Sequence, residues 1–322
     1  MLDKSAVKVR VMAIHYEAPD VRSYVLRRID GVAFPPIDPG SHIDVQLSGT
    51  IERSFSLSNS NSDQGDYRIT VAREENGLGG SKLIHDSVRA GDVLTISEPR
   101  NNFALVQDAA RSLFIAGGIG ITPFIPMLTA LNRGRHIWKL VYCARDPERT
   151  PLLGEANGLA ETGNGEVILH FSANGGGRLD IGNVVADLTA DTHVYCCGPV
   201  GMLRDFRAVA DQNGIPGSRL HFEYFKSDAE RAKDGGFTVV LQRSGKQVLV
   251  QAGQTILEAL QDVGIEVSYS CMEGICGSCE TRVISGTPDH RDMVLSERDR
   301  RTKSTMMVCC SGAKSDRLVL DL

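Results

Sequence analysis

Four of the eight cysteines in this 322-residue chain follow a spacing that constrains the fold more than any other feature. The spacing is C-x4-C-x2-C with a further cysteine after 29 intervening residues, and its members are Cys271, Cys276, Cys279 and Cys309. Plant-type [2Fe–2S] clusters use this spacing, because three thiolates come from one loop and the fourth comes from a distant strand. Gly274 and Gly277 suit such a loop, since glycine lets backbone N–H groups approach the sulfurs.

A zinc site is the alternative for these cysteines. Structural zinc sites typically use short C-x2–4-C pairs at both ends, whereas the fourth cysteine here stands beside a single neighbour. The spacing alone leaves open whether Cys309 or Cys310 is the fourth ligand. Cys143, Cys196 and Cys197 are expected to be mostly structural, and the absence of cysteine from the first 142 residues argues against a disulfide framework.

Composition and charge exclude several classes of protein. Hydrophobic residues make up 42% and charged residues 23% of the chain, which is ordinary for a globular protein with buried cores. The net charge of −5 gives no global attraction to nucleic acid or to an anionic membrane. No apolar run approaches the roughly 18 residues of a membrane helix, and the opening MLDKSAVKVR lacks the apolar core of a secretory signal. We therefore expect a cytoplasmic protein without nucleic-acid or membrane partners.

The length of the chain favours two or three domains, and its residue patterns indicate three. Residues 1–105 alternate β-branched runs with turn residues, which predicts an antiparallel β-barrel with one helix at 79–88. Residues 106–225 alternate buried strands with helices, which predicts a doubly wound α/β domain with a parallel sheet. The polar stretch 226–235 is predicted to be a linker, and residues 236–322 are predicted to form a third domain.

This third domain has local signals of its own. A hairpin is predicted at its start, with Ser244 and Gly245 in the turn. A helix follows, with Thr255 as its N-cap and Gly264 as its C-cap. The cysteine-rich loop comes next, and the strand 318–322 ends the chain.

Two glycine-bearing loops follow strands of the predicted α/β domain. The first, 117-GGIGITP-123, opens a helix, and the second is 197-CGPVGM-202. Pro123 stands where the dinucleotide fingerprint has its third glycine, so the first loop matches that motif only weakly. Backbone N–H groups in such loops still attract phosphate, and loops at the carboxyl ends of parallel strands line the ligand crevice. Two ordinary strand–helix turns remain the alternative.

A third loop, 143-CARDPER-149, bears on the choice of nucleotide. Asp146 could accept hydrogen bonds from the ribose hydroxyls of NADH, whereas Arg145 or Arg149 could meet the extra phosphate of NADPH. We expect NADH. The predicted nucleotide-binding residues are Gly117, Gly118, Arg145, Asp146, Cys197, Gly198, Pro199 and Met202.

Two segments of the predicted barrel could bind a phosphate-bearing ligand. The segment 53-RSFSLSN-59 alternates like a strand, with Arg53 and Phe55 on one face and serines on the other. The second segment, 79-GGS-81, precedes the predicted helix, whose N-terminus favours an anion. Arg53 and Arg73 could add charge-assisted contacts to a phosphate. Taken alone, 53–59 could equally be a strand with a polar edge.

Taken in order, these motifs resemble the phthalate dioxygenase reductase family, which includes the vanillate O-demethylase oxidoreductases. The matching motifs are 53-RSFSL, 79-GGS, 117-GGIGITP, 197-CGP and the cysteine spacing, and the resemblance covers residues 5–322. The family comprises the reductase components of Rieske-type oxygenases. The resemblance implies a flavin barrel that binds FMN, an NADH domain of the ferredoxin–NADP reductase type and a C-terminal β-grasp domain of the plant-type ferredoxin kind.

The resemblance also assigns residues to the flavin. Those that match the family's R-x-Y-S motif are Arg53, Ser54, Phe55 and Ser56, with Phe55 in place of the commoner tyrosine. Those that match the stretch around the FMN phosphate are Ala72, Arg73, Gly79, Gly80 and Ser81. Leu78 stands where a basic residue is common, so phosphate affinity is expected to rest more on Arg53 and on backbone amides.

Further positions follow from the same resemblance. Thr122 matches a threonine near the flavin ring, and Phe225 matches an aromatic residue that packs on the flavin. Ser56 and Thr122 are expected to tune the flavin nitrogen and are the predicted catalytic residues. Cys309 aligns with the fourth cluster ligand, whereas Cys310 aligns with an apolar position.

The function implied is electron transfer from NADH to FMN, then singly to the [2Fe–2S] cluster, then to an external terminal oxygenase. The chain is expected to be a monomer that forms a transient complex with that oxygenase. Two alternatives stay open. One is an FAD-dependent reductase that serves another electron acceptor, and the other is a zinc- or redox-sensing regulatory protein.

Overall fold

The computed structural model divides the chain into two compact units, Met1–Glu223 and Tyr224–Leu322. It describes residues 6–48, 51–59, 65–75, 79–173, 175–186, 188–225, 232, 235–269, 272–275, 277–295 and 297–322. The first unit contains two sheets, one antiparallel and one parallel, and the second unit contains a mixed sheet beside a small two-stranded one.

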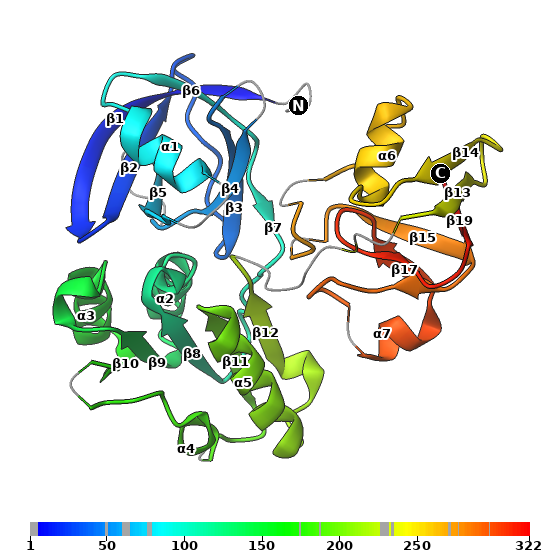
Figure 1. The fold of residues 1–322 in the computed structure, drawn as a ribbon. Helices are drawn as coiled ribbons and strands as arrows, with labels where there is room; N and C mark the ends of the chain where they lie inside the picture. The colour runs from blue at the N-terminus through cyan, green and yellow to red at the C-terminus, as the bar shows by residue number, and fades with distance from the viewer. Residues whose placement is uncertain are drawn as a thin grey trace. The chain divides into compact units, whose positions relative to one another are not determined.

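The antiparallel sheet forms the N-terminal lobe of the first unit (Figure 1). Its elements are β1 (Val7–Ala18), β2 (Val21–Arg28), β3 (Ser41–Gln46), β4 (Glu52–Ser56), β5 (Tyr67–Ala72), α1 (Gly80–Ser87), β6 (Val93–Ile96) and β7 (Arg100–Asn101). The strands run in the order β4-β3-β6-β1-β2-β5, and β7 pairs with β3. A bridge between Leu57 and Ile69 joins the two ends of this order and closes the sheet. The predicted antiparallel barrel is confirmed, and so is its single helix.

Alternation of residue types explains why these segments form strands. In β1, Val7, Val9 and Val11 are buried, whereas Lys8 and Arg10 between them are exposed. Successive side chains of a strand point to opposite faces, so one face of β1 lines the barrel core and the other meets solvent.

The parallel sheet forms the second lobe of the first unit. Its strands are β8 (Arg111–Gly117), β9 (Ile137–Ala144), β10 (Asn164–Phe171), β11 (Thr192–Cys197) and β12 (Leu220–Glu223), in the order β10-β9-β8-β11-β12. The chain moves outward from β8 to β10 and then returns to place β11 on the other side of β8. The point between β8 and β11 is therefore the topological switch point, where open α/β sheets bind their ligands.

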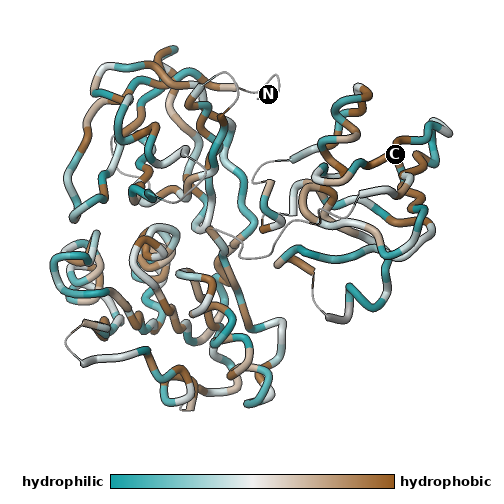
Figure 2. The backbone as a smooth tube through the Cα atoms, in the orientation of Figure 1, coloured by the Kyte–Doolittle hydropathy of each residue, from teal (hydrophilic) through white to brown (hydrophobic). Residues whose placement is uncertain are grey.

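Helices cover both faces of this sheet. They are η1 (Gly118–Ile121), α2 (Phe124–Arg133), η2 (Pro147–Arg149), α3 (Leu153–Thr162), α4 (Ile181–Val185), α5 (Val200–Gln212) and η3 (Gly217–Arg219). Figure 1 shows α2 and α3 on one side of the strands and α4 and α5 on the other. Brown and teal segments alternate along α5 in Figure 2, as expected for a helix that buries Leu203, Phe206 and Ala210 and exposes its other face. The predicted doubly wound α/β domain is confirmed.

The second unit is built on a five-stranded sheet in the order β14-β13-β19-β15-β17. Its elements are β13 (Phe237–Leu241), β14 (Gln247–Val250), α6 (Ile256–Asp262), β15 (Glu280–Ser285), β16 (Pro288–Asp289), α7 (Glu297–Thr302), β17 (Thr305–Met307), β18 (Gly312–Ala313) and β19 (Arg317–Leu320). β13 pairs in parallel with β19, and β13 pairs antiparallel with β14. This ferredoxin-type fold agrees with the one that the family resemblance implies.

The local signals of the second unit have the expected geometry. Gly245 takes a φ of +67° in the predicted hairpin turn. Thr255 caps α6 in a reciprocal arrangement, because its hydroxyl accepts from the Glu258 N–H while the Glu258 carboxylate accepts from the Thr255 N–H. The C-cap of α6 is Val263, and Gly264, the predicted C-cap, is the next residue and has a φ of +73°.

Ala232, within the predicted linker 226–235, belongs to the packed part of the second unit. It is 8% exposed, and its N–H donates to the carbonyl of Cys310 at 2.9 Å. In the described part of the chain, the helices are too short or too polar to span a bilayer.

Candidate functional site

The two glycine loops predicted to line a crevice meet at the switch point. Gly117 ends β8. Gly198 directly follows β11, the strand that pairs with β8. A Cβ on Gly117 would lie 2.5 Å from Cδ of Pro199, and a Cβ on Gly120 would clash with the carbonyl of Cys197. The backbones of the two loops therefore pack directly against each other, and side chains at these glycines would force them apart.

Side chains around these loops hold them in place. Tyr142 lies within hydrogen-bonding distance of two carbonyls, that of Gly118 at 3.1 Å and that of Pro151 at 2.8 Å. Met202, in the first turn of α5, lies beside the glycines: a Cβ on Gly198 would be 3.0 Å from its Sδ. The structure thus brings together six of the predicted nucleotide-binding residues, namely Gly117, Gly118, Cys197, Gly198, Pro199 and Met202, and their contact with NADH stays a prediction.

The third predicted loop lies at the carboxyl end of β9. Asp146 caps η2 by accepting from the Arg149 N–H at 3.0 Å, and it forms an ion pair with the Arg149 guanidinium at 2.6 Å. Desolvation alone would raise the pKa of Asp146, but these hydrogen bonds outweigh it and lower that pKa. Arg145 is exposed beside them. Its carbonyl accepts from the N–H of Ala173, which ties this loop to the one after β10.

Ser56, one of the two predicted catalytic residues, contacts a carboxyl group that sequence reasoning missed. Its hydroxyl donates to Oε2 of Glu223 at 3.3 Å, and the Cys197 thiol lies 3.8 Å from the same oxygen. Cys197 and Glu223 are register partners on β11 and β12. The three residues join the barrel strand β4 to the switch point of the parallel sheet. The one available signal was an acidic residue in the otherwise largely aromatic segment 221-HFEYF-225.

The surroundings of Glu223 change its protonation. Although part of the side chain reaches solvent, desolvation of the carboxyl group raises its pKa to about 8, and the hydrogen bonds from Ser56 and Cys197 only partly oppose this. Burial also raises the pKa of the Cys197 thiol well above its usual value, so this thiol stays protonated. A carboxyl group that titrates near neutral pH at a ligand crevice is suited to hold and release a proton.

Thr122, the other predicted catalytic residue, ends η1 directly before α2. It is 2% exposed, and its hydroxyl donates to the carbonyl of Ile119 at 3.0 Å. The hydroxyl proton is therefore engaged by η1, which leaves the oxygen able to accept a hydrogen bond.

The predicted phosphate site lies where β4 passes the N-terminus of α1. Gly79 takes a φ of +83°, and no described side chain caps the helix. The first turn reads Gly-Ser-Lys-Leu and carries no acidic residue. A Cβ on Gly80 would clash with Cγ of Arg53 and lie 2.9 Å from its Nε, so the Arg53 side chain lies along this glycine. An open helix N-terminus beside an arginine fits a phosphate group.

Two other residues predicted to bind this phosphate, Arg73 and Ser81, contact groups of the protein itself. Arg73 forms ion pairs with Glu75 at 2.6 Å and with Asp86, in the last turn of α1. Ser81 accepts from the Glu74 N–H at 3.0 Å. Leu78 lies outside the described residues. Arg73 and Lys82 are thus both paired with carboxylates, whereas the Arg53 side chain lies along Gly80 at the first turn of α1.

The remaining residues of the predicted flavin motif extend along β4 and β5. Ser54 donates to Oδ1 of Asp44 at 2.6 Å, and Asp44 is buried beside Arg100. Phe55 is partly exposed on the same strand, and Ala72 ends β5. Phe225 is partly buried at the start of the second unit, and its packing on a flavin stays a prediction.

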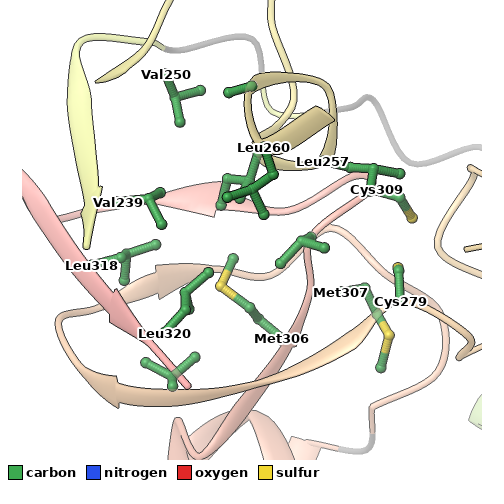
Figure 3. Close-up of a cluster of buried hydrophobic side chains, with 14 of the residues drawn as sticks. Val239, Val250, Leu257, Leu260, Cys279, Met306, Met307, Cys309, Leu318 and Leu320 are labelled. Atoms are coloured by element: carbon green, nitrogen blue, oxygen red, sulfur yellow. The ribbon is translucent and has the colours of Figure 1, made fainter. Parts of the chain in front are cut away.

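Two of the four predicted cluster ligands lie at the ends of neighbouring strands of the second unit: Cys279 directly precedes β15, and Cys309 follows β17 by two residues. Glu280 of β15 is the register partner of Met307 of β17, and the Cys279 carbonyl accepts from the Val308 N–H. The ladder therefore places Cys279 next to Cys309, although 30 positions separate them in the sequence. Each is 2% exposed and neither is in a disulfide. Figure 3 shows both at one edge of the apolar core.

Cys271 and Cys276 lie outside the described residues, and no metal-binding group of three side chains is found among those described. The glycines of the same loop have the expected backbone: φ is +71° at Gly274 and +78° at Gly277. Cys310 is 1% exposed, and its thiol lies 3.8 Å from the Met307 carbonyl. A buried, apolar role for Cys310 agrees with the assignment of Cys309 as the ligand, which stays a prediction.

Comparison with known proteins identifies two of the domains directly. Residues 114–208 match the oxidoreductase NAD-binding domain family, and residues 239–314 match the 2Fe-2S iron-sulfur cluster binding domain family. The chain is 43% identical over 316 residues to the phenoxybenzoate dioxygenase subunit beta of Ectopseudomonas oleovorans, covering 98% of this chain and 97% of that protein.

Solved structures show the same likeness. Phthalate dioxygenase reductase, described as a modular structure for electron transfer from pyridine nucleotides to [2Fe-2S], aligns with a TM-score of 0.74 and 35% identity over 98% of both chains. An intact type IV self-sufficient cytochrome P450 monooxygenase aligns with a TM-score of 0.82 and 36% identity, covering 98% of this chain and 41% of that longer chain.

Proposed function

The chain belongs to the phthalate dioxygenase reductase and vanillate O-demethylase oxidoreductase family of NAD(P)H-dependent flavin and iron–sulfur oxidoreductases, and on that premise we propose that it transfers electrons from NADH, with FMN and a [2Fe–2S] cluster, to the terminal oxygenase of an aromatic dioxygenase, monooxygenase or O-demethylase system. The observation that carries this proposal is the meeting of Ser56, Cys197 and Glu223 at the switch point, in a chain that also contains the cluster-binding domain.

The chemistry of the bound groups is that of the cofactors: a flavin takes a hydride from a nicotinamide and releases the two electrons singly to an iron–sulfur cluster. The protein must bind and orient both partners and deal with the proton. A hydride enters and two electrons leave, so one proton must be released in each turnover. Glu223, whose Oε2 accepts from Ser56 and whose pKa is about 8, is placed to take up that proton.

The FMN proposal rests on the site at the N-terminus of α1. Arg53 and the N–H groups that follow Gly79 would bind the terminal phosphate, and Ser54, Phe55, Ser56, Ala72, Arg73, Ser81, Thr122 and Phe225 would complete the flavin site. Mass spectrometry of the flavin released by heat tests this proposal. FMN is expected, and FAD would support the alternative reductase instead.

The NADH proposal rests on Asp146, whose carboxylate would accept hydrogen bonds from the ribose hydroxyls. The 2′-phosphate of NADPH would bring a second anion close to this carboxylate, although Arg145 and Arg149 lie nearby. The ratio of kcat/KM for NADH and NADPH tests this. A ratio well above one is expected, and a ratio below one would contradict the proposal.

The cluster ligands that we propose are Cys271, Cys276, Cys279 and Cys309. We further propose a monomer that acts in the cytoplasm, where NADH is supplied, with a barrel domain at 1–105, a nucleotide domain at 106–225 and a ferredoxin-type domain at 236–322 after a linker at 226–235.

The visible spectrum of the purified protein tests the whole proposal. Flavin and [2Fe–2S] bands that NADH bleaches are expected, together with NADH-dependent product formation when a cognate oxygenase is added. A colourless, zinc-loaded protein would instead support the regulatory alternative.

A further inference from the structure

Asp292 is a buried carboxylate that the proposed reaction does not use. The residue is 1% exposed, and its side chain has no accessible surface. Its Oδ1 accepts from the N–H groups of Val294 at 3.0 Å and Leu295 at 2.7 Å. An aspartate that accepts from the N–H groups two and three residues ahead folds the backbone into a tight turn. Leu295 packs in the apolar core of the second unit, so the turn is anchored there.

This turn contacts the loop to which three of the proposed ligands belong. Gly274 lies in that loop, between Cys271 and Cys276 in the sequence. Its carbonyl accepts from the N–H of Met293 at 2.9 Å. A Cβ at residue 274 would lie only 3.1 Å from Cα of Asp292. The turn and the loop are therefore in both hydrogen-bonding and van der Waals contact.

The same face of Gly274 also meets the segment that contains the proposed fourth ligand. A Cβ on Gly274 would clash with Sγ of Cys310, the neighbour of Cys309 in the sequence. Gly274 therefore packs against both the Asp292 turn and the segment that follows β17. Its φ of +71° and its missing side chain are what allow this close approach.

Burying this carboxylate carries a free-energy cost that an apolar residue would avoid. Arg300 of α7 compensates part of the charge, since its Nη2 contacts the main-chain carbonyl of Asp292 and lies 4.0 Å from Oδ1. Nδ1 of His290 lies 3.8 Å from Oδ2, and among the described residues that oxygen has no hydrogen-bond partner. A buried charge with one oxygen unpaired is a poor way to stabilise a core. Its effect on the structure falls instead on the backbone beside Gly274.

We propose that Asp292 is a positioning residue of the iron–sulfur site, whose carboxylate holds the turn that packs on Gly274 beside Cys310 and so fixes the cluster-binding loop. The inference rests on the ligand assignment proposed above. A loop that is held in this way loses the cluster more slowly and surrounds it with one fixed arrangement of protein groups. The first unit is unaffected.

The test compares full-length holoprotein with Asp292→Asn, Asp292→Ser and Asp292→Ala. Asp316→Ala, an exposed aspartate in the same unit, is the matched control. Decay of the cluster absorbance and release of iron to a chelator are measured at fixed temperature, together with the electron paramagnetic resonance spectrum after reduction. Asparagine keeps the Oδ1 acceptor, serine offers a shorter one and alanine removes it. NADH-driven ferricyanide reduction checks the flavin unit.

Cluster loss is expected about tenfold faster in Asp292→Ala, the scale of one net hydrogen bond, with Asp292→Ser between it and a nearly normal Asp292→Asn. The spectrum of the reduced cluster is expected to broaden in the same order. Equal lifetimes for Asp292→Ala and Asp316→Ala would overturn the proposal, as would an Asp292→Asn variant that loses its cluster as fast as Asp292→Ala. If Asp292→Ala does not fold, the cluster lifetimes of the other two variants decide. A shorter lifetime in Asp292→Ser than in Asp292→Asn supports the proposal, and equal lifetimes overturn it.

A Cys309→Ser variant separates this proposal from the ligand assignment. Retention of a normal cluster in Cys309→Ser would show the assignment to be wrong. Loss of the cluster there, with an unchanged lifetime in every Asp292 variant, would remove the positioning role and leave the assignment standing.

Discussion

At the scale of single residues, the chemistry of the candidate site depends on groups whose surroundings change their protonation. Desolvation raises the pKa of Glu223 to about 8, so the carboxyl group is mostly protonated at neutral pH. Desolvation acts in the opposite sense on a base, and together with the charge of His193 it lowers the pKa of His221 to about 4. These two residues, two positions apart at the end of the first unit, make opposite contributions to its pH dependence.

We predict that Glu223→Gln lowers steady-state turnover with a one-electron acceptor by about a hundredfold, the scale of a lost general base. Glutamine keeps the size and polarity of the side chain but cannot take up a proton. In the parent protein, the rate of the step that needs the ionised carboxylate should increase as the pH rises through about 8. This increase in rate should be absent in the variant. Stopped-flow and steady-state rates from pH 6 to 9 check both points. Glu161→Gln, exposed on α3, is the control, and a Glu223→Gln variant within twofold of it would refute the role.

We predict that His221 makes the first unit less stable in acid. Its folded pKa lies below its unfolded value, so the unfolded chain binds more protons between pH 6.5 and about 4. The free energy of unfolding that depends on neutral His221 is therefore complete above pH 6.5, and it is lost as the pH falls through this window. His221→Gln should remove about 1–2 kcal/mol of this pH dependence, a value reduced for partial solvent contact. Denaturant unfolding followed by flavin fluorescence at pH 7 and pH 5 measures it, and parallel pH profiles for the two proteins would contradict it.

At the scale of elements, local signals could be predicted from the sequence, whereas contacts between distant segments could not. The cap at Thr255, the turn at Gly245 and helix α1 depend on neighbouring residues, and each forms where the pattern places it. Ser56 and Glu223 are 167 positions apart, and only the closing of the barrel onto the parallel sheet brings them together. For the same reason the pairing of Arg73 with Asp86 was not anticipated, since it depends on how α1 lies against β5.

We predict that Gly80→Ala weakens FMN binding about tenfold, because a Cβ would displace the Arg53 side chain from the N-terminus of α1 and cost a charge-assisted contact. Fluorescence titration of the flavin-free protein with FMN gives the Kd. Gly158→Ala, on α3 with open space around its Cα, is the matched control and should bind FMN normally. An unchanged Kd in Gly80→Ala would show that the phosphate lies elsewhere.

We predict that Gly120→Ala raises KM for NADH roughly tenfold, since small displacements of a positioning loop are costly. The added Cβ would clash with the Cys197 carbonyl, a backbone atom that cannot rotate away, so the two glycine loops must separate. FMN content should stay normal, which distinguishes this effect from general unfolding. A KM equal to that of the parent protein would mean that the packing of these loops does not shape the nucleotide site.

At the scale of the whole molecule, the division into two compact units implies that hydride chemistry and single-electron chemistry can be separated by mutation. The first unit contains the switch point, the open end of α1 and Glu223, and the second contains the four cysteines proposed as cluster ligands. Cys309 and Cys310 offer a test in adjacent residues. Both are almost fully buried, yet the Cys310 thiol lies against Gly274 and the Met307 carbonyl, whereas Cys309 follows the ladder that brings it beside Cys279.

We therefore predict that Cys309→Ser abolishes NADH-dependent reduction of cytochrome c, which needs the cluster, but leaves ferricyanide reduction by the flavin within twofold of the parent value. Cys310→Ala should retain the cluster, because that buried position needs an apolar side chain and not a thiolate. Iron and sulfide content, the visible spectrum and the two acceptor assays are measured on the same preparations. If Cys310→Ala loses the cluster while Cys309→Ser keeps it, the ligand is Cys310. If both variants lose ferricyanide reduction as well, the two units do not work independently, and the flavin site must depend on an intact second unit.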